Sequence, residues 1–131
     1  MKTYLDTSAL MKIIVEERES PALRRYLERI QADTLFTAAL TRTELIRAAR
    51  RVDDAAVVGA WKVLSGLATV NVTTAVLDAA ANLSPPLLRT LDAIHLASAQ
   101  RAGTDLRAVI TYDARMAEAA EALAIPVVAP A

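Results

Sequence analysis

Thr3-Tyr4-Leu5-Asp6 is the stretch that decides the fold. It is a short, mostly apolar run that ends in an acid, and similar short runs recur along the chain with longer helical segments between them. Short apolar strands that alternate with helices are typical of a parallel sheet covered by helices on both faces. The predicted strands are Thr3–Asp6, Thr34–Thr37, Val70–Val72, Ala108–Thr111 and Val127–Val128.

The segments between these strands have apolar residues at helical spacing. Ser20-Pro21 and Thr73-Thr74 each predict a helix start. Gly103 predicts the end of a helix that begins near Asp92, and a last helix is expected over Ala114–Leu123. The stripes expected in the core are Leu23, Tyr26, Leu27 and Ile30, then Leu40, Leu45 and Ile46, then Val57, Val58, Trp61 and Leu64. The sequence therefore predicts one α/β domain over residues 1–131, a three-layer α/β/α sandwich with a central, mainly parallel sheet.

The composition limits the classes of protein that the chain can belong to. It has 131 residues, of which 54% are hydrophobic and 23% are charged, as expected of one domain with a sizeable core. With no cysteine, a disulfide framework and a thiolate metal site are both excluded. No apolar run approaches the ~20 residues that span a bilayer, and Asp6 comes too early for a signal peptide, so we expect a cytoplasmic protein without a membrane partner. Fifteen basic residues balance fifteen acidic ones, so any attraction to nucleic acid must come from local patches.

Four acids lie where such a sheet binds ligands. Ligands of open α/β sheets bind outside the carboxyl ends of the strands. Asp6 ends the first predicted strand and Asp113 follows the fourth, so both point from the same edge. Asp92 lies in the first turn of a predicted helix, and Glu44 lies within another. We expect these four acids, far apart in the sequence, to converge on one cleft.

Three of these acids also have a structural explanation. Asp92 could favour the helix dipole behind a cap formed by Thr90, and Asp113 could cap the helix that follows it. Glu44 could complete a capping box in which Thr41 is the cap. Alternatively Thr37 is the cap, and Glu44 is then free to face the cleft.

Asp6 is harder to explain structurally, because the end of an apolar strand is more often occupied by a polar loop residue or glycine. Clustered carboxylates repel one another, so a site that retains several usually binds a cation. With oxygen ligands only, the expected ion is Mg²⁺ or Mn²⁺, and no other cofactor is predicted. The only histidine, His95, is expected to be a packed and hydrogen-bonded core residue.

In order and spacing, four segments of the chain resemble the PIN-domain ribonucleases, and more closely the VapC toxins of bacterial and archaeal toxin–antitoxin pairs. The resemblance covers nearly the whole chain. The segments that carry it are Tyr4-Leu5-Asp6-Thr7-Ser8-Ala9-Leu10, Leu40-Thr41-Arg42-Thr43-Glu44-Leu45, Leu91-Asp92-Ala93-Ile94-His95-Leu96-Ala97 and Ile110-Thr111-Tyr112-Asp113-Ala114.

The resemblance implies hydrolysis of RNA by a metal-dependent endoribonuclease. It implies that Asp6, Glu44, Asp92 and Asp113 are the catalytic residues and surround one or two divalent ions. It also implies a cognate antitoxin that inhibits the enzyme, and a homodimer. Some relatives carry a further acid shortly after the one that matches Asp113, whereas this chain has none before Glu118, which leaves a second ion position open.

Other polar residues near these acids could contact the substrate. Ser8 and Thr111 could bind the phosphate or a water, although local turn bonds would explain each as well. The arginines that could hold flanking phosphates are Arg42, Arg47, Arg50, Arg51 and Arg89, with a solvated helix face as the simpler explanation for Arg50 and Arg51. Part of the apolar run from Leu10 to Val15 could line a groove for an antitoxin helix, or all of it could be buried.

Competing functions remain for an acidic cleft on such a sheet. A phosphoacceptor domain would be expected to carry a second acid two residues after Asp6, where this chain has Ser8. A non-catalytic PIN-fold adaptor and a housekeeping RNA-processing nuclease without an antitoxin would both share the predicted fold. Retention of all four acids argues against the adaptor.

Overall fold

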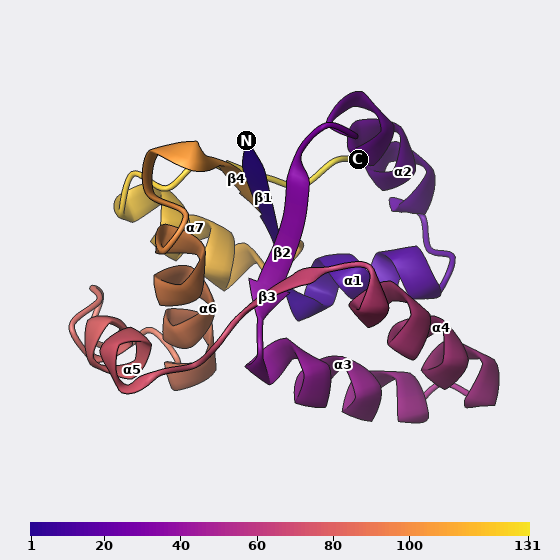
Figure 1. Ribbon diagram of the computed structural model, residues 1–131, viewed down its shortest axis with the longest axis horizontal. Coiled ribbons are helices and arrows are strands. Elements are labelled where there is room, and N and C mark those ends of the chain that lie inside the picture. Colours follow the sequence, from indigo (N-terminus) through magenta and orange to yellow (C-terminus); the bar gives the residue numbers. More distant parts are fainter.

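A five-stranded parallel sheet lies between two groups of helices in the computed structural model, which describes residues 1–131 (Figure 1). The strands are β1 (Lys2–Leu5), β2 (Thr34–Ala38), β3 (Ala68–Val70), β4 (Leu106–Ile110) and β5 (Val127–Val128), in the sheet order β3-β2-β1-β4-β5. The helices are α1 (Thr7–Ile14), α2 (Ser20–Arg29), α3 (Leu40–Arg50), α4 (Asp54–Ser65), α5 (Thr74–Ala81), α6 (Thr90–Gln100) and α7 (Ala114–Ala122). A 3₁₀ turn spans Gly103–Asp105. The predicted fold class is confirmed.

The central strand β1 is apolar at consecutive positions because both of its faces are covered. Successive side chains of a strand point to opposite faces. Tyr4 is fully buried on the face covered by α6 and α7, where it packs against Phe36 of β2 with the ring centroids 5.2 Å apart. Leu5 is fully buried on the other face, in a cluster with side chains of α1, α2, α3 and α4. The sheet thus separates two apolar cores.

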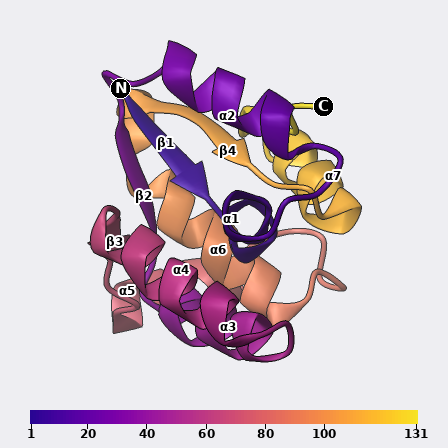
Figure 2. The same cartoon turned by 90° about the vertical axis from the view of Figure 1, so that its right-hand side faces the viewer.

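The strand order reverses beside β1. The chain passes from β1 to β2 and β3 on one side of the sheet, and β4 and β5 are added on the other side. Figure 2 shows β1 and β4 side by side, with α1 at the end of β1. The loops after β1 and β4 therefore meet at a topological switch point, where α/β sheets bind ligands. The backbone amide of Asp6 donates to the carbonyl of Ile110 at 3.3 Å, which joins these two loops at their origin.

The third strand and the end of α6 lie at other positions than predicted. The third strand lies two residues earlier than expected, because its pairing with β2 ends where Ala38 faces Val70. Val72 lies beyond the sheet and packs against the cluster formed by α5 and α6. Gly103, predicted to end α6, lies after the helix in the 3₁₀ turn, where its φ of +56° suits a residue without a side chain.

The apolar stripe predicted for α4 is wrong at two positions. Val58 is 69% exposed and Trp61 is 49% exposed. The buried face of α4 consists instead of two alanines and one leucine, Ala56, Ala60 and Leu64. A Cβ on Gly59 would lie 3.3 Å from Cγ2 of Ile14, so α1 and α4 approach each other too closely for large side chains at that contact.

None of the helices combines the length and the apolarity that crossing a membrane requires.

Candidate active site

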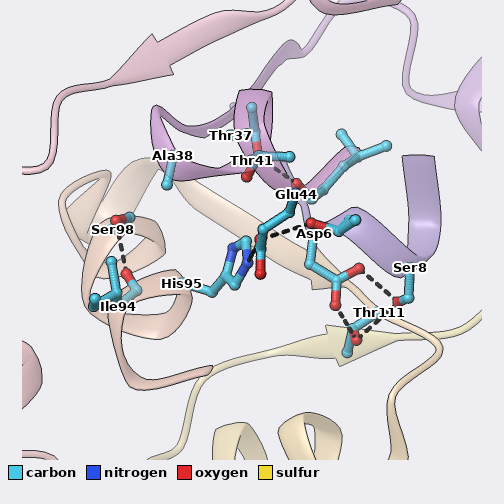
Figure 3. Close-up of polar contacts among 12 residues, drawn as sticks. Asp6, Ser8, Thr37, Ala38, Thr41, Glu44, Ile94, His95, Ser98 and Thr111 are labelled. Carbon is cyan, nitrogen blue, oxygen red and sulfur yellow. Dashed lines mark hydrogen bonds and ion pairs between the residues drawn. The ribbon is translucent and has the colours of Figure 1, made fainter. Parts of the chain in front are cut away.

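The four predicted acids are connected at the switch point by hydrogen bonds in two groups, and Figure 3 shows the group that contains Asp6 and Glu44. Asp6 and Glu44 both lie at the start of α1, since Asp6 precedes the helix and Thr7 in its first turn donates to Glu44 at 2.8 Å. Asp92 and Asp113 are joined by a shared arginine. The loop after β4 links the two groups, because it carries Asp113 and because the hydroxyl of Thr111 in the same loop donates to Asp6.

Asp6 is a buried carboxylate with hydrogen bonds on both oxygens. It is only 2% exposed. Its Oδ1 accepts from the Ser8 hydroxyl at 2.7 Å and from the Ala9 amide at 2.9 Å, and its Oδ2 accepts from the Thr111 hydroxyl at 2.5 Å. Burial raises the pKa of Asp6, and these three hydrogen bonds act against that rise. Asp6 therefore also caps α1, a structural role that was not predicted for it.

Glu44 ends a chain of hydrogen bonds that begins inside the core. The Ala38 amide donates to the Tyr4 hydroxyl oxygen at 3.2 Å, and that hydroxyl lies 2.5 Å from Nδ1 of His95. Nε2 of His95 lies 2.6 Å from Oε1 of Glu44, which also accepts from Thr7. This pattern suits one imidazole tautomer, in which Tyr4 donates to Nδ1 and His95 donates from Nε2. His95 is buried and hydrogen-bonded, as predicted, but its contact with Glu44 was not foreseen.

Neither cap proposed for α3 forms. The N-cap is Ala39, which offers no side-chain bond, and Thr37 and Thr41 instead bond to each other at 2.7 Å. Glu44 is therefore free to turn toward His95. Burial raises the pKa of Glu44, but the hydrogen-bonding and electrostatic interactions with His95, together with the bond from Thr7, outweigh burial and lower that pKa overall.

Arg89 lies between the other two acids. Its Nε contacts Asp92 Oδ2 at 3.3 Å, and its Nη2 contacts Asp113 Oδ2 at 3.4 Å. Asp113 also caps α7, because its Oδ1 accepts from two backbone amides in the first turn. The Thr90 cap considered for α6 is wrong, since the N-cap residue is Arg89, whose side chain makes no capping bond to the helix. Asp92 is thus left to face Arg89 from the first turn of α6.

The residues predicted to contact substrate have different surroundings. Besides contacting Asp6, the Ser8 hydroxyl accepts from the Tyr112 amide at 2.9 Å, and the Thr111 hydroxyl accepts from the Asp113 amide at 3.1 Å. These two hydroxyls therefore hold the acids and the loop after β4 in place. Arg42 points elsewhere, with its guanidinium 5.5 Å from the centre of the Trp61 ring.

The acids suit a divalent cation in donor type but do not form one compact cluster. No set of three or more His, Cys, Asp or Glu side chains is close enough to hold a metal ion together. All four predicted ligands offer carboxylate oxygens, which hard cations such as Mg²⁺ prefer. Asp92 and Asp113 already share one positive group, the Arg89 guanidinium, and the side chain of Arg89 is 58% exposed. This pair of carboxylates therefore already faces one positive charge.

Comparisons with known proteins agree with the observed fold, and the matches cover almost the whole chain. The sequence matches the model of the PIN domain over residues 3–122. It is 46% identical over 127 residues to ribonuclease VapC46 of Mycobacterium tuberculosis, with 97% of this chain and 96% of that protein covered.

Two crystal structures share the fold at low sequence identity. One is Mycobacterium tuberculosis VapC20, described as a toxin that cleaves the sarcin-ricin loop, with a TM-score of 0.70, 18% identity, and coverage of 89% of this chain and 94% of that one. The other is VapBC2 of Rickettsia felis bound to a DNA fragment from their promoter, with a TM-score of 0.77, 12% identity and full coverage of both chains.

Proposed function

Because the chain belongs to the PIN-domain family and matches a VapC ribonuclease over almost its whole length, it is a ribonuclease of the VapC toxin type, and we propose that it acts as a metal-dependent endoribonuclease. In this proposal, Mg²⁺ or Mn²⁺ is held by Asp6, Glu44, Asp92 and Asp113. The single observation that carries the proposal is the buried Asp6 carboxylate at the switch point, bonded to the same loop that carries Asp113.

A buried carboxylate is unfavourable unless positive charge or hydrogen bonds compensate it. The three donors to Asp6 compensate it only in part, since its pKa stays raised. A cation near Asp6 and Asp113 would complete that compensation. This need for charge supports an ion at the switch point rather than a purely structural carboxylate.

The side chains of the site then have separate tasks. Ser8 and Thr111 fix the orientation of Asp6, and the bonds from His95 and Thr7 hold Glu44 through Oε1, which leaves its Oε2 for an ion or a water. When bound, a divalent ion lowers the pKa of a water and supplies positive charge beside the scissile phosphate. Asp92 and Asp113 would bind on the side of the site where Arg89 now lies.

Cleavage assays with purified protein test this function. We expect cleavage of RNA in Mg²⁺ or Mn²⁺, none in excess chelator, and a loss of at least about 100-fold in rate for Asp6→Asn, the scale of losing a group that acts in the transition state. Asp78→Asn on the exposed face of α5 is the matched control and should keep full activity. Cleavage that persists in excess chelator would refute the metal mechanism, and an unimpaired Asp6→Asn enzyme would refute the site.

Metal binding has a readout that does not depend on activity. A ligand that binds only the native state stabilises it by mass action. We expect Mn²⁺ to raise the melting temperature of the wild type and of Asp78→Asn, and to raise that of Asp6→Asn much less. Equal shifts in all three proteins would mean that the ion binds elsewhere.

The partner proposed for this chain is a cognate antitoxin. The Rickettsia felis relative is described as VapBC2 with promoter DNA, and this chain has partly exposed apolar side chains on α1, where Leu10 is buried but Met11, Ile13 and Ile14 are not fully covered. We propose that an apolar antitoxin helix covers them. The product of the neighbouring reading frame should co-purify with this chain and abolish cleavage. A housekeeping nuclease would show neither effect.

A homodimer is proposed from the family resemblance. Light scattering of the purified chain should give twice the 14.0 kDa of one chain. A mass of one chain at all concentrations would contradict the dimer and leave the nuclease proposal intact.

A further inference from the structure

A groove runs along α3 and adjoins the candidate active site. Its volume is about 790 Å³. The groove is lined by seven residues of α3 and its C-cap and by one of α6, namely Leu40, Thr43, Glu44, Arg47, Ala48, Arg50, Arg51 and Leu91. Figure 1 shows α3 extending from the end of β2 along the lower side of the molecule.

Three arginines dominate the charge of this groove. Arg47, Arg50 and Arg51 are all exposed, and none of them takes part in a salt bridge or a side-chain hydrogen bond. Three other arginines of the chain are paired with acids, as in the contact of Arg24 with Glu16 at 2.7 Å. Three unpaired guanidinium groups in one groove make a local positive patch on a chain whose net charge is zero.

The groove leads into the candidate active site. Glu44, its only acid, is bonded to His95, and Leu91 in its other wall directly precedes Asp92. Seven residues separate Glu44 from Arg51, which corresponds to about 10 Å along a helix that rises 1.5 Å per residue. That length is about the rise of three stacked nucleotides at 3.4 Å each. A polyanion held by the arginines would therefore reach the acids.

We propose that this arginine groove binds the backbone phosphates of the RNA strand next to the bond that is cut. The inference rests on the proposed function, since it names where that substrate lies. Guanidinium groups bind phosphate oxygens with two parallel hydrogen bonds, and such contacts position a strand without reading its sequence. Cations in the last turn of a helix also favour its dipole, but that role needs no groove and no connection to the acids.

The test compares two triple variants that remove equal charge. Arg47, Arg50 and Arg51 are changed to Gln together in one variant. The control changes Arg18, Arg25 and Arg101 to Gln; these exposed arginines lie outside the groove, and Arg101 occupies the same C-cap position on α6 that Arg51 occupies on α3. Binding of an end-labelled oligouridylate is followed by fluorescence anisotropy in excess chelator, where no cleavage occurs, over a range of salt concentrations.

For the groove variant we expect the dissociation constant to rise at least about tenfold and the slope of log K against log salt to fall by about 2, at about 0.7 per lost phosphate contact. The control should change neither quantity by a comparable amount. Equal effects in both variants, or none in either, would overturn the proposal. Unchanged RNA binding together with lost binding of an oligoglutamate peptide would overturn it too, and would assign the groove to an acidic protein partner.

Failure of the groove proposal is distinguishable from failure of the nuclease proposal. If the wild type cleaves RNA in Mn²⁺ while the groove variant binds RNA normally, only the groove proposal fails. If the wild type neither cleaves nor binds RNA, the proposed function fails, and the groove proposal fails with it.

Discussion

At the residue scale, the Asp6 carboxylate combines two properties that oppose each other. It stabilises α1 as an N-cap, and it is buried at 2% exposure in a position where ionisation is unfavourable. Burial is the largest cause that raises its pKa, and the bonds from Thr111, Ser8 and Ala9 reduce the rise without removing it. Active sites commonly reduce stability in this way for the sake of a functional charge.

The first prediction concerns the pH dependence of stability. An acid whose pKa is raised on folding stabilises the native state most below its unfolded pKa, and this contribution is lost as pH rises through the folded pKa. Without metal, Asp6→Asn should therefore gain stability relative to the wild type as pH rises above the ordinary value of 3.8. Asn remains a good N-cap, so α1 should keep its start.

Thermal unfolding of both proteins in chelator, from about pH 4 to about pH 8, measures this difference. We expect the melting temperature of Asp6→Asn at neutral pH to equal or exceed that of the wild type. A variant that is clearly less stable at neutral pH would mean that hydrogen bonding outweighs burial at Asp6.

At the scale of one element, α4 shows how close packing selects small side chains. Ala56, Ala60 and Leu64 face the core, whereas Val58 and Trp61 face outward, and Arg42 of α3 stacks on the Trp61 ring. The helix lies against both α1 and α3. Close approach on two sides favours residues with little volume at the contact.

The matching prediction compares an exposed valine with a buried leucine in α4. Val58→Ser should change the free energy of unfolding by no more than about 0.5 kcal/mol, because surface substitutions away from special features have small effects. Leu64→Ala should lower it by about 2–5 kcal/mol, since it leaves a cavity in the core. Urea denaturation measures both. A large loss for Val58→Ser would mean that this side chain belongs to the core.

At the scale of the whole molecule, Asp33 joins three strands at their N-terminal ends, away from the acids of the candidate active site. It lies just before β2 and accepts from Thr3 of β1 at 2.8 Å and from Arg107 of β4 at 2.6 and 3.0 Å. The Met1 ammonium group lies 3.5 Å from the same carboxylate. The Arg107 guanidinium is the main reason that the pKa of Asp33 lies well below its usual range.

The last prediction follows from this depressed pKa. An acid of this kind contributes stability that is fully present above its unfolded pKa, here the ordinary 3.8, and is lost as pH falls toward the folded pKa. Asp33→Asn should therefore lower the melting temperature at neutral pH and reduce the loss of stability between about pH 4 and about pH 2. Asp54→Asn, an exposed acid in the first turn of α4, is the control. An acid-unfolding profile identical to that of the wild type would contradict the role of Asp33.

Much of the fold followed from local pattern. Five strands were predicted, and four of them overlap the observed strands closely, because a strand buried on both faces is apolar at consecutive positions wherever it lies in the sheet. The start of α2 at Ser20 and the cap of α5 at Thr73 were also predicted from capping chemistry, which is a contact between near neighbours in the chain. The positions of Asp6 and Asp113 after their strands were predictable for the same reason.

The amino-acid sequence by itself determined the strands, their parallel arrangement and the acids at their carboxyl ends, since each of these depends on residue types a few positions apart. Only the tertiary structure decided that Arg89 joins Asp92 to Asp113, that His95 bonds to Glu44, and which face of α4 is buried. Those outcomes depend on how closely distant segments approach. Hydrophobic periodicity records which residues are apolar, but not the distance to the neighbour that they meet.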